Sequence, residues 1–311
     1  TVGYSKTNFA DPEAGAGRQN WGNPWFTTLL AYPYESPDDW YNVDNPTLIT
    51  KYYDRETGRL KTVASVYAKA SITDWLSVKT NFGLDFMYNR NVSTLHRDHP
   101  NAQQNHGYYG QTSSELFRYT WTNTINVNKD FANGHSLNAV AGMEMFQGKW
   151  YTSNFTGYDL NSDMMQSPAG IGDKSGSSLF PPSIGGGRTM SNLMSFFAQA
   201  SYSIANKYNF SASLRHDTSS KFYEDNASAT FWSVGASWLI SSESWFDNAK
   251  WLNQLKLRAS YGTTGNQDGV SDFGTFDGYY NSSYNGESGY SHGQLGNSEL
   301  RWETSAQTNV G

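Results

Sequence analysis

The chain has 311 residues and a formal net charge of −6, and it contains no cysteine. The lack of cysteine excludes a disulfide framework, a thiolate metal site and a cysteine nucleophile, and the negative charge provides no global basic field that would attract nucleic acid. Charged residues and aromatic residues each make up 16% of the chain, whereas disordered segments combine high charge with few aromatics.

Membrane-spanning helices are not predicted. The longest unbroken apolar run has four residues, Leu29 to Tyr32, whereas a spanning helix requires roughly 20. Transmembrane strands carry apolar residues only at alternate positions, so a membrane β-barrel remains open.

The hydrophobic pattern has a period of two along most of the chain. Residues 1–59 show little of it and are expected to be mostly loop. The clearest segment, residues 76–88, exceeds the ~5–6 residues of a usual globular strand and suits a tilted strand that crosses a membrane. About nine strands are predicted, at residues 60–72, 76–88, 115–128, 136–148, 194–204, 208–217, 230–240, 254–262 and about 300–311.

The links between these strands alternate in length. The short links are residues 73–75, 129–135 and 205–207, the long links are residues 91–114, 149–193 and 263–299, and residues 218–229 and 241–253 form a nearly equal pair. In an up-and-down sheet all short links then lie at one end, as they do in outer-membrane barrels. Aromatic residues also gather near both strand ends, as the two interfacial girdles of such barrels require.

These features predict an all-β fold, an antiparallel up-and-down transmembrane β-barrel, with residues 1–311 forming part of one barrel domain. Single-chain bacterial barrels have an even number of strands, so about nine strands indicate a fragment of a larger barrel. A soluble all-β protein that binds or cleaves glycans is the alternative, and it would bury the apolar stripe of residues 76–88 in a core.

Four stretches carry more specific motifs. They are GHSL at residues 134–137 followed by AGME at 141–144, LRHDTSSKF at 214–222, LKLRASYGTTGNQ at 255–267, and GN at 296–297 followed by LRWET at 300–304. In residue type and order these stretches resemble hallmarks of the SusC/RagA-like TonB-dependent transporters of the Bacteroidetes outer membrane, with Thr218 standing where that pattern usually has Gly.

The resemblance implies a plugged barrel of about 22 strands, of which this chain would hold the central part without the plug, the TonB-contacting segment or the C-terminal closing strands. It implies active import of oligosaccharides or peptides across the bacterial outer membrane, driven through the TonB complex and aided by a SusD-like surface lipoprotein lid. A passive porin or a structural barrel scaffold is the alternative function. The expected partners are these proteins and the lipid bilayer, with no nucleic acid.

Two sets of candidate residues follow from the pattern. Charged residues at the polar positions of the strands are expected to face the lumen, where ion pairs with each other or with the plug are favoured over substrate contact: Arg118, Glu144, Arg215, Asp217, Arg258 and Glu303. Aromatic residues in the long outer loops are expected to contact substrate or a partner protein: Trp150, Tyr151, Tyr158, Tyr279, Tyr280, Tyr284 and Tyr290.

Catalytic and metal sites are not predicted. Residues 289–293 match the G-x-S-x-G nucleophile elbow, but that motif requires a helix to follow, and none is indicated, so the chain is not expected to be an enzyme. His96, Asp98, His99 and His106 are a weak set of metal ligands. No cofactor is expected; Ca²⁺ bound by Glu35, Asp38, Asp39 and Asp44 is left as an alternative, although these residues lack EF-hand spacing.

Overall fold

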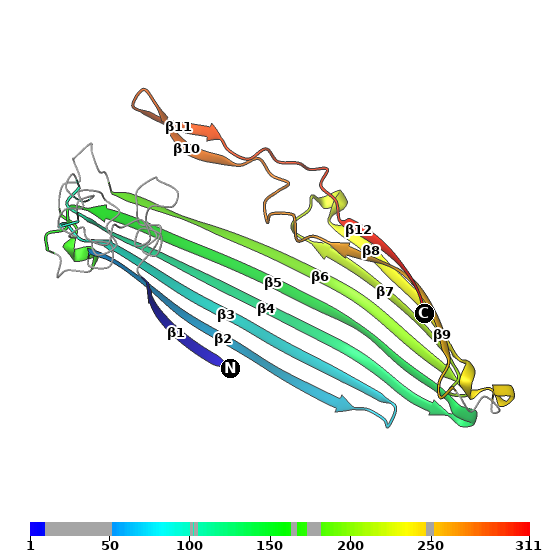
Figure 1. Ribbon diagram of the computed structural model, residues 1–311. Coiled ribbons are helices and arrows are strands. Elements are labelled where there is room, and N and C mark those ends of the chain that lie inside the picture. The colour runs from blue at the N-terminus through cyan, green and yellow to red at the C-terminus, as the bar shows by residue number, and fades with distance from the viewer. Residues whose placement is uncertain (10–51, 100–101, 103–104, 163–166, 173–181, 247–251) are drawn as a thin grey trace, which may run out of the picture. The chain divides into compact units, whose positions relative to one another are not determined.

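The computed structural model describes residues 1–311 except 10–51, 100–101, 103–104, 163–166, 173–181 and 247–251. Its main element is a ten-stranded sheet in which the strands follow the chain order, β1-β2-β3-β4-β5-β6-β7-β8-β9-β12, and β10 and β11 form a separate hairpin (Figure 1). The all-β, up-and-down arrangement predicted from the sequence is thus confirmed. The strands are β1 (Val2–Phe9), β2 (Tyr53–Ser71), β3 (Leu76–Leu95), β4 (Tyr108–Phe131), β5 (His135–Tyr158), β6 (Ser183–Ile204), β7 (Tyr208–Ser219), β8 (Ser228–Leu239), β9 (Lys256–Asn266), β10 (Tyr279–Tyr284), β11 (Glu287–His292) and β12 (Glu303–Val310). Short 3₁₀ turns lie at Ala132–Gly134, Pro168–Gly170, Glu224–Asn226, Ile240–Ser242 and Ser244–Phe246.

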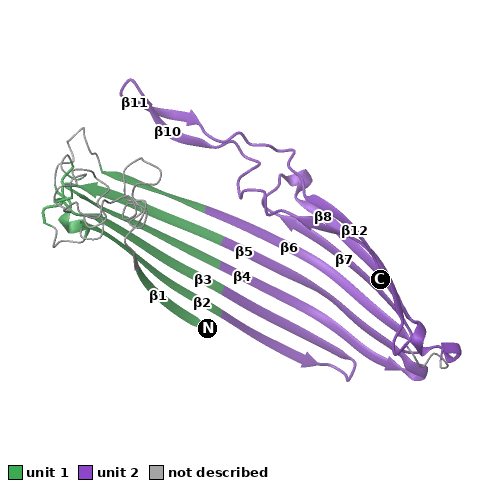
Figure 2. Cartoon of the chain, in the orientation of Figure 1, with its two compact units in different colours: residues 1–63, 85–117, 149–188 green, residues 64–84, 118–148, 189–311 purple. Residues whose placement is uncertain are grey.

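The chain divides into two compact units, coloured separately in Figure 2. Unit 1 comprises residues 1–63, 85–117 and 149–188, and unit 2 comprises residues 64–84, 118–148 and 189–311. Strands β2 to β6 therefore contribute one part to each unit.

In unit 2 the strand register separates polar from apolar side chains. Residues paired directly across neighbouring antiparallel strands point to the same side of the sheet, and β6, β7, β8, β9 and β12 pair in this way in sequence. We define the apolar face by Phe210, Ala212, Leu214, Trp232, Val234, Ala236, Leu257, Ala259 and Tyr261. We define the polar face by Ser211, Ser213, Arg215, Ser233, Gly235, Ser237, Arg258, Ser260 and Gly262.

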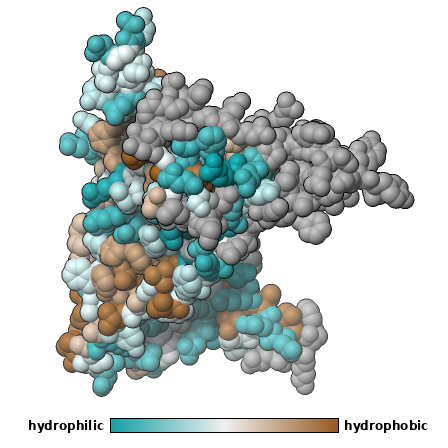
Figure 3. Space-filling model, turned by 90° about the vertical axis from the view of Figure 1, so that its left-hand side faces the viewer, coloured by the Kyte–Doolittle hydropathy of each residue, from teal (hydrophilic) through white to brown (hydrophobic). Residues whose placement is uncertain are grey.

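The large side chains of the apolar face are not covered by any described part of the chain. Leu214 is 53% exposed and Phe210 is 50% exposed, and in the space-filling view hydrophobic residues gather low on one side of the molecule (Figure 3). Val78 and Phe82, from the stripe that a soluble protein would bury, are exposed as well. The described residues therefore lack the core that the soluble alternative requires.

Tight turns explain how the long strands reverse direction. Ala205 and Asn206 between β6 and β7 both have positive φ, as do Asn133 and Gly134 between β4 and β5. Two successive residues with positive φ are characteristic of type I′ hairpin turns, whose twist matches that of the flanking strands.

Glu243 organises the longer link between β8 and β9. Its carboxylate accepts hydrogen bonds from Tyr208 Oη at 2.6 Å, Lys207 Nζ at 3.1 Å and Trp238 Nε1 at 3.1 Å. The bond from the Tyr208 hydroxyl, supported by those from Trp238 and Lys207, holds the pKa of Glu243 below its ordinary value. The link is thereby attached to the ends of β7 and β8.

Unit 1 has a small core of its own. Tyr53, Leu95 and Ala102 are buried against one another, with Tyr108 packed beside them. The antiparallel pairing of β1 with β2 is accompanied by an ion pair of 2.9 Å between Lys6 Nζ and Glu56 Oε2.

Several predicted boundaries were wrong. β3, β4, β5 and β6 extend into residues 91–114 and 149–193, which the sequence assigned to loops. Apolar alternation stops before the backbone ladder does, because a strand needs apolar side chains only where one face meets an apolar environment. β1 and the start of β2 are strands within residues 1–59, and residues 10–51, which make up most of the expected loop, lie outside the described residues.

The order of the links also differs from the prediction in one place. The link between β7 and β8 at residues 220–227 is shorter than the link between β8 and β9 at residues 240–255, so the sorting of short and long links by sheet end fails for this pair. The hairpin of β10 and β11 lies within residues 263–299, which were expected to be loop. Its signal was present as the dipeptide Asn285-Gly286, both residues of which have positive φ, since Asn-Gly is the preferred type I′ turn.

Candidate functional site

Arg215 is the centre of a charged network on the polar face. Its Nε donates to Asp217 Oδ1 at 2.7 Å and Oδ2 at 3.1 Å, and its Nη2 donates to Glu144 Oε1 at 3.2 Å and to Ser195 Oγ at 2.8 Å. Glu144 also accepts a hydrogen bond of 3.1 Å from Thr122 Oγ1. The guanidinium thus carries two carboxylates, one of which, on Asp217, is 91% hidden from solvent.

The register of the strands brings these groups together. Ser195 of β6 lies directly opposite Asp217 of β7, and Phe197 lies opposite Arg215, with the guanidinium 5.8 Å from the Phe197 ring centroid. A side chain at Gly142 of β5 would collide with the Phe197 ring. Gly142 therefore leaves space for the ring on which Arg215 lies.

All six predicted lumen-facing residues lie on the polar face, but only three of them join this network. Arg118 shares the face with Thr122 by strand alternation, and Arg258 pairs with Ser237. Glu303 lies opposite Asn266, whose Nδ2 donates to Glu303 Oε2 at 3.0 Å. Within the described residues, no ion pair links Arg118, Arg258 or Glu303 to a partner of opposite charge.

A second cluster joins motifs that are far apart in the sequence. Phe222, buried at the end of the LRHDTSSKF stretch, packs against Trp302 of the LRWET stretch with ring centroids 5.2 Å apart. Trp302 also contacts Phe231 at 5.7 Å and donates from Nε1 to the carbonyl of Ala227 at 3.1 Å. A side chain at Gly265 would overlap the Phe231 ring.

Polar contacts hold the same motifs together. Ser219 Oγ donates to Gln267 Oε1 at 2.5 Å, and Lys221 Nζ donates to the Val270 carbonyl at 2.9 Å. The motif residues thus serve to close the ends of β7, β8, β9 and β12 around one another. Their recurrence in three separate stretches has a structural explanation that requires no ligand.

The β10–β11 hairpin presents tyrosines on both of its sides. Tyr279 shares one side with Tyr290, which lies opposite Asn281, and Tyr280 shares the other side with Tyr284. Tyr284 and Tyr290 are 88% and 81% exposed. Exposed aromatic groups at this density offer stacking surfaces to sugar rings or to apolar groups of a partner.

The predicted loop position of the other aromatic set was wrong. Trp150, Tyr151 and Tyr158 lie on β5, because that strand continues past residue 148. Trp150 and Tyr151 are exposed, and Tyr158 lies edge-on to Tyr108 with ring centroids 6.3 Å apart. These residues are therefore held by a strand instead of an irregular loop.

The candidate catalytic and metal groups are dispersed. Ser291 of the G-x-S-x-G match lies on β11 opposite Tyr280, and no helix follows it, so the elbow geometry is not formed. His96 pairs with Asp54 and His106 with Asp159, each at 2.8 Å. Among the described residues no group of three or more possible metal ligands occurs, and the acidic residues 35–44 lie outside them.

Within the described part of the chain, no helix has the length and apolar character needed to cross a bilayer.

Comparison with known proteins identifies relatives along nearly the whole chain. The family model described as TonB dependent receptor-like, beta-barrel matches residues 3–311. TonB-dependent receptor P39 of Formosa agariphila is 28% identical over 275 residues, which cover 87% of this chain and 26% of that protein. TonB-dependent receptor SusC of Bacteroides thetaiotaomicron is 35% identical over 130 residues, which cover 40% of this chain and 13% of that protein.

A solved structure agrees with these matches. The structure of the RagAB peptide transporter superposes with a TM-score of 0.76 at 22% identity, covering 84% of this chain and 28% of the matched chain. At this identity the likeness shows the fold alone. The resemblance inferred from the motifs is confirmed, and the chain spans about a quarter of the length of P39 and a smaller share of SusC.

Proposed function

Since the chain belongs to the TonB dependent receptor-like β-barrel family, we propose that it is the central part of an outer-membrane barrel that actively imports oligosaccharides or peptides. The observation that carries this proposal is the two-sided sheet of unit 2, with exposed Phe210 and Leu214 on one face and Arg215 with its carboxylates on the other. A barrel wall in lipid needs an apolar outer surface and tolerates charge on its inner surface.

The proposed mechanism is binding and gated passage without covalent chemistry. Energy would reach a plug through the TonB complex, and a SusD-like surface lipoprotein would hold the nutrient over the barrel. The relatives P39 and SusC bear the name TonB-dependent receptor, and the RagAB structure is titled a peptide transporter. These names support the partners and the direction of transport as proposals for the full-length protein.

The β10–β11 hairpin is the proposed contact for nutrient or lipoprotein. Tyr279 and Tyr290 on one side and Tyr280 and Tyr284 on the other leave few apolar contacts of their own unmade, since each ring is more than half exposed. On β5, Trp150 and Tyr151 offer a second exposed aromatic surface. Flat rings with adjacent Ser and Asn hydrogen-bonding groups suit both sugars and peptides.

The test uses the full-length protein in the outer membrane of its own bacterium. Cells lacking it would be grown on a panel of single oligosaccharides and peptides, and growth should fail on one nutrient class. Uptake of that nutrient should stop when a protonophore collapses the proton-motive force. Uptake that continues without the proton-motive force would favour the passive porin, and growth on every nutrient would favour a structural scaffold.

Hairpin variants test the aromatic contact. Tyr284→Ser with Tyr290→Ser should raise the half-saturating nutrient concentration by about threefold to tenfold, the value expected when one or two stacking contacts are lost. Leu295→Ser is the matched control, because Leu295 is also highly exposed and lies beside the hairpin without an aromatic ring. Equal effects of the two changes would contradict a stacking role.

A further inference from the structure

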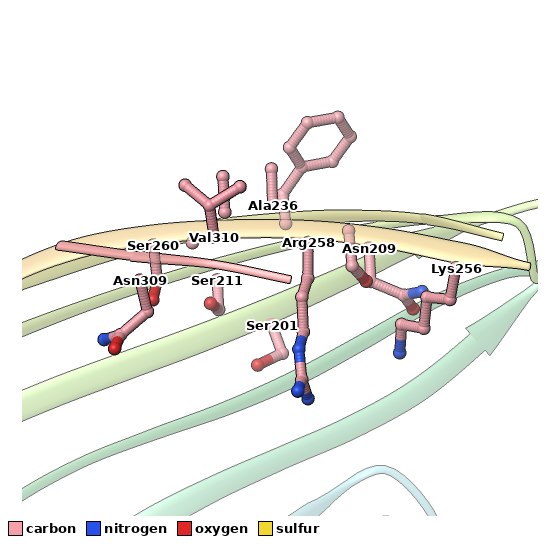
Figure 4. Close-up of a pocket in the computed structure, with 13 residues that line it drawn as sticks. Ser201, Asn209, Ser211, Ala236, Lys256, Arg258, Ser260, Asn309 and Val310 are labelled. Carbon is pink, nitrogen blue, oxygen red and sulfur yellow. The ribbon is translucent and has the colours of Figure 1, made fainter.

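A pocket of about 570 Å³ lies among β6, β7, β8, β9 and β12 of unit 2. Figure 4 shows Lys256, Arg258 and Asn309 extending to one side of the sheet, whereas Ala236 and Val310 extend to the other. The remaining polar groups of its wall are short: Ser201, Ser211, Ser237 and Ser260, with Asn209 beside them. The two long cationic side chains thus stand over a floor of small residues.

The charges in this pocket are not balanced. Within the described residues, neither Lys256 nor Arg258 forms an ion pair with a carboxylate. Arg215, on the same face of the same sheet, has both Asp217 and Glu144 within 3.2 Å. The sheet therefore neutralises one arginine completely and leaves two neighbouring cations without a counter-charge.

Position on the strand makes these two cations act together. Lys256 and Arg258 are two residues apart on β9, so they emerge on the same side about 6.7 Å apart along the strand. Serine hydroxyls and asparagine amides surround them, and both groups can donate and accept hydrogen bonds. A guanidinium with a nearby ammonium is well suited to one carboxylate held in a fork or to two carboxylates side by side.

We propose that this pocket binds a carboxylate-bearing group through Lys256 and Arg258, with Asn209 and Asn309 as flanking hydrogen-bond partners. The inference rests on the proposed function only in that the polar face borders the barrel interior. Two cations facing an interior that lacks a counter-charge would lose solvation without compensation. The carboxylate is supplied either by an acidic solute in transit or by a part of the full-length protein outside residues 1–311.

The experiment uses the detergent-solubilised full-length protein and two tripeptide probes, tri-glutamate and the uncharged tri-glutamine. The test variant combines Lys256→Gln with Arg258→Gln. The control variant is Lys207→Gln, which removes a cation that already has a carboxylate partner, Glu243, outside the pocket. Binding is measured by calorimetry at low and high salt, and the unfolding midpoint in urea is measured for each protein.

A solute site predicts that the wild type binds tri-glutamate at least about tenfold more tightly than tri-glutamine, and that only the double variant loses this preference. A carboxylate from the protein itself predicts no preference for tri-glutamate, together with a lower unfolding midpoint for the double variant than for the control. If the double variant matches the control in both measurements, the proposal is wrong. Nutrient uptake by the wild type is scored separately, so failure of the transport proposal is recognised independently.

Discussion

Replacing Arg215 with methionine should destabilise the protein by about 2 kcal/mol. The substitution keeps much of the apolar stem but removes the donors to Asp217, Glu144 and Ser195. Breaking a fully buried pair by removing one partner costs about 3–5 kcal/mol, and a hydrogen bond to a charged group contributes about 1.5–3 kcal/mol. Because the Arg215 side chain is 38% exposed, solvent screens part of the interaction, and the lower part of this range is expected.

The assay is equilibrium unfolding in urea of the full-length protein, combined with a double-mutant cycle. Asp217→Leu alone removes the most buried carboxylate of the network, and it should cost less when Arg215→Met is already present, because the two residues share one interaction. Arg258→Met is the matched control, since Arg258 is exposed on the same face without an ion pair among the described residues. A loss below about 0.5 kcal/mol for Arg215→Met, or strictly additive effects in the cycle, would refute the reasoning.

Three further predictions concern other parts of the sheet. Gly265→Ala should lower the unfolding midpoint in urea, because the added methyl group overlaps the Phe231 ring and the strand ends have little room to shift; an unchanged midpoint would contradict this close approach. Leu214→Arg should destabilise the lipid-embedded protein by about 2–4 kcal/mol, whereas Ser213→Arg on the other face should be tolerated, and the two can be compared by unfolding in lipid vesicles. Glu243 has a lowered folded pKa, so its contribution to stability is present above its unfolded pKa near 4.3 and is lost as the pH falls through the folded value; Glu243→Gln should flatten this acid limb of the pH–stability curve.

The strands of the sheet could be predicted because a two-sided environment leaves its period in the sequence. Residues 76–88 and 208–217 alternate cleanly, and both lie within observed strands. Strand ends were missed where neither face requires apolar residues, as in β5 beyond residue 148, which carries Trp150 and Tyr151. Backbone hydrogen bonds continue there, but side-chain hydropathy no longer reports them.

The charged network could be predicted only in part. The two-residue spacing places Arg215 and Asp217 on one face, and the structure pairs them at 2.7 Å. The contribution of Glu144 depends on which residues of β5, β6 and β7 lie side by side, and alternation does not determine that register. The partnership of Gly142 with Phe197 has the same origin.

The small residues of the polar face carry a physical argument about what fills the interior. In a small barrel the inward side chains must themselves fill the space, which requires bulky residues. Here the polar face of β7, β8 and β9 is lined by Ser211, Ser213, Ser233, Gly235 and Ser260, and the long side chains Arg215 and Arg258 are isolated among them. Such a wall leaves its interior to something other than its own side chains. This favours a wide, separately plugged barrel over a small self-filled one, on grounds independent of the sequence motifs.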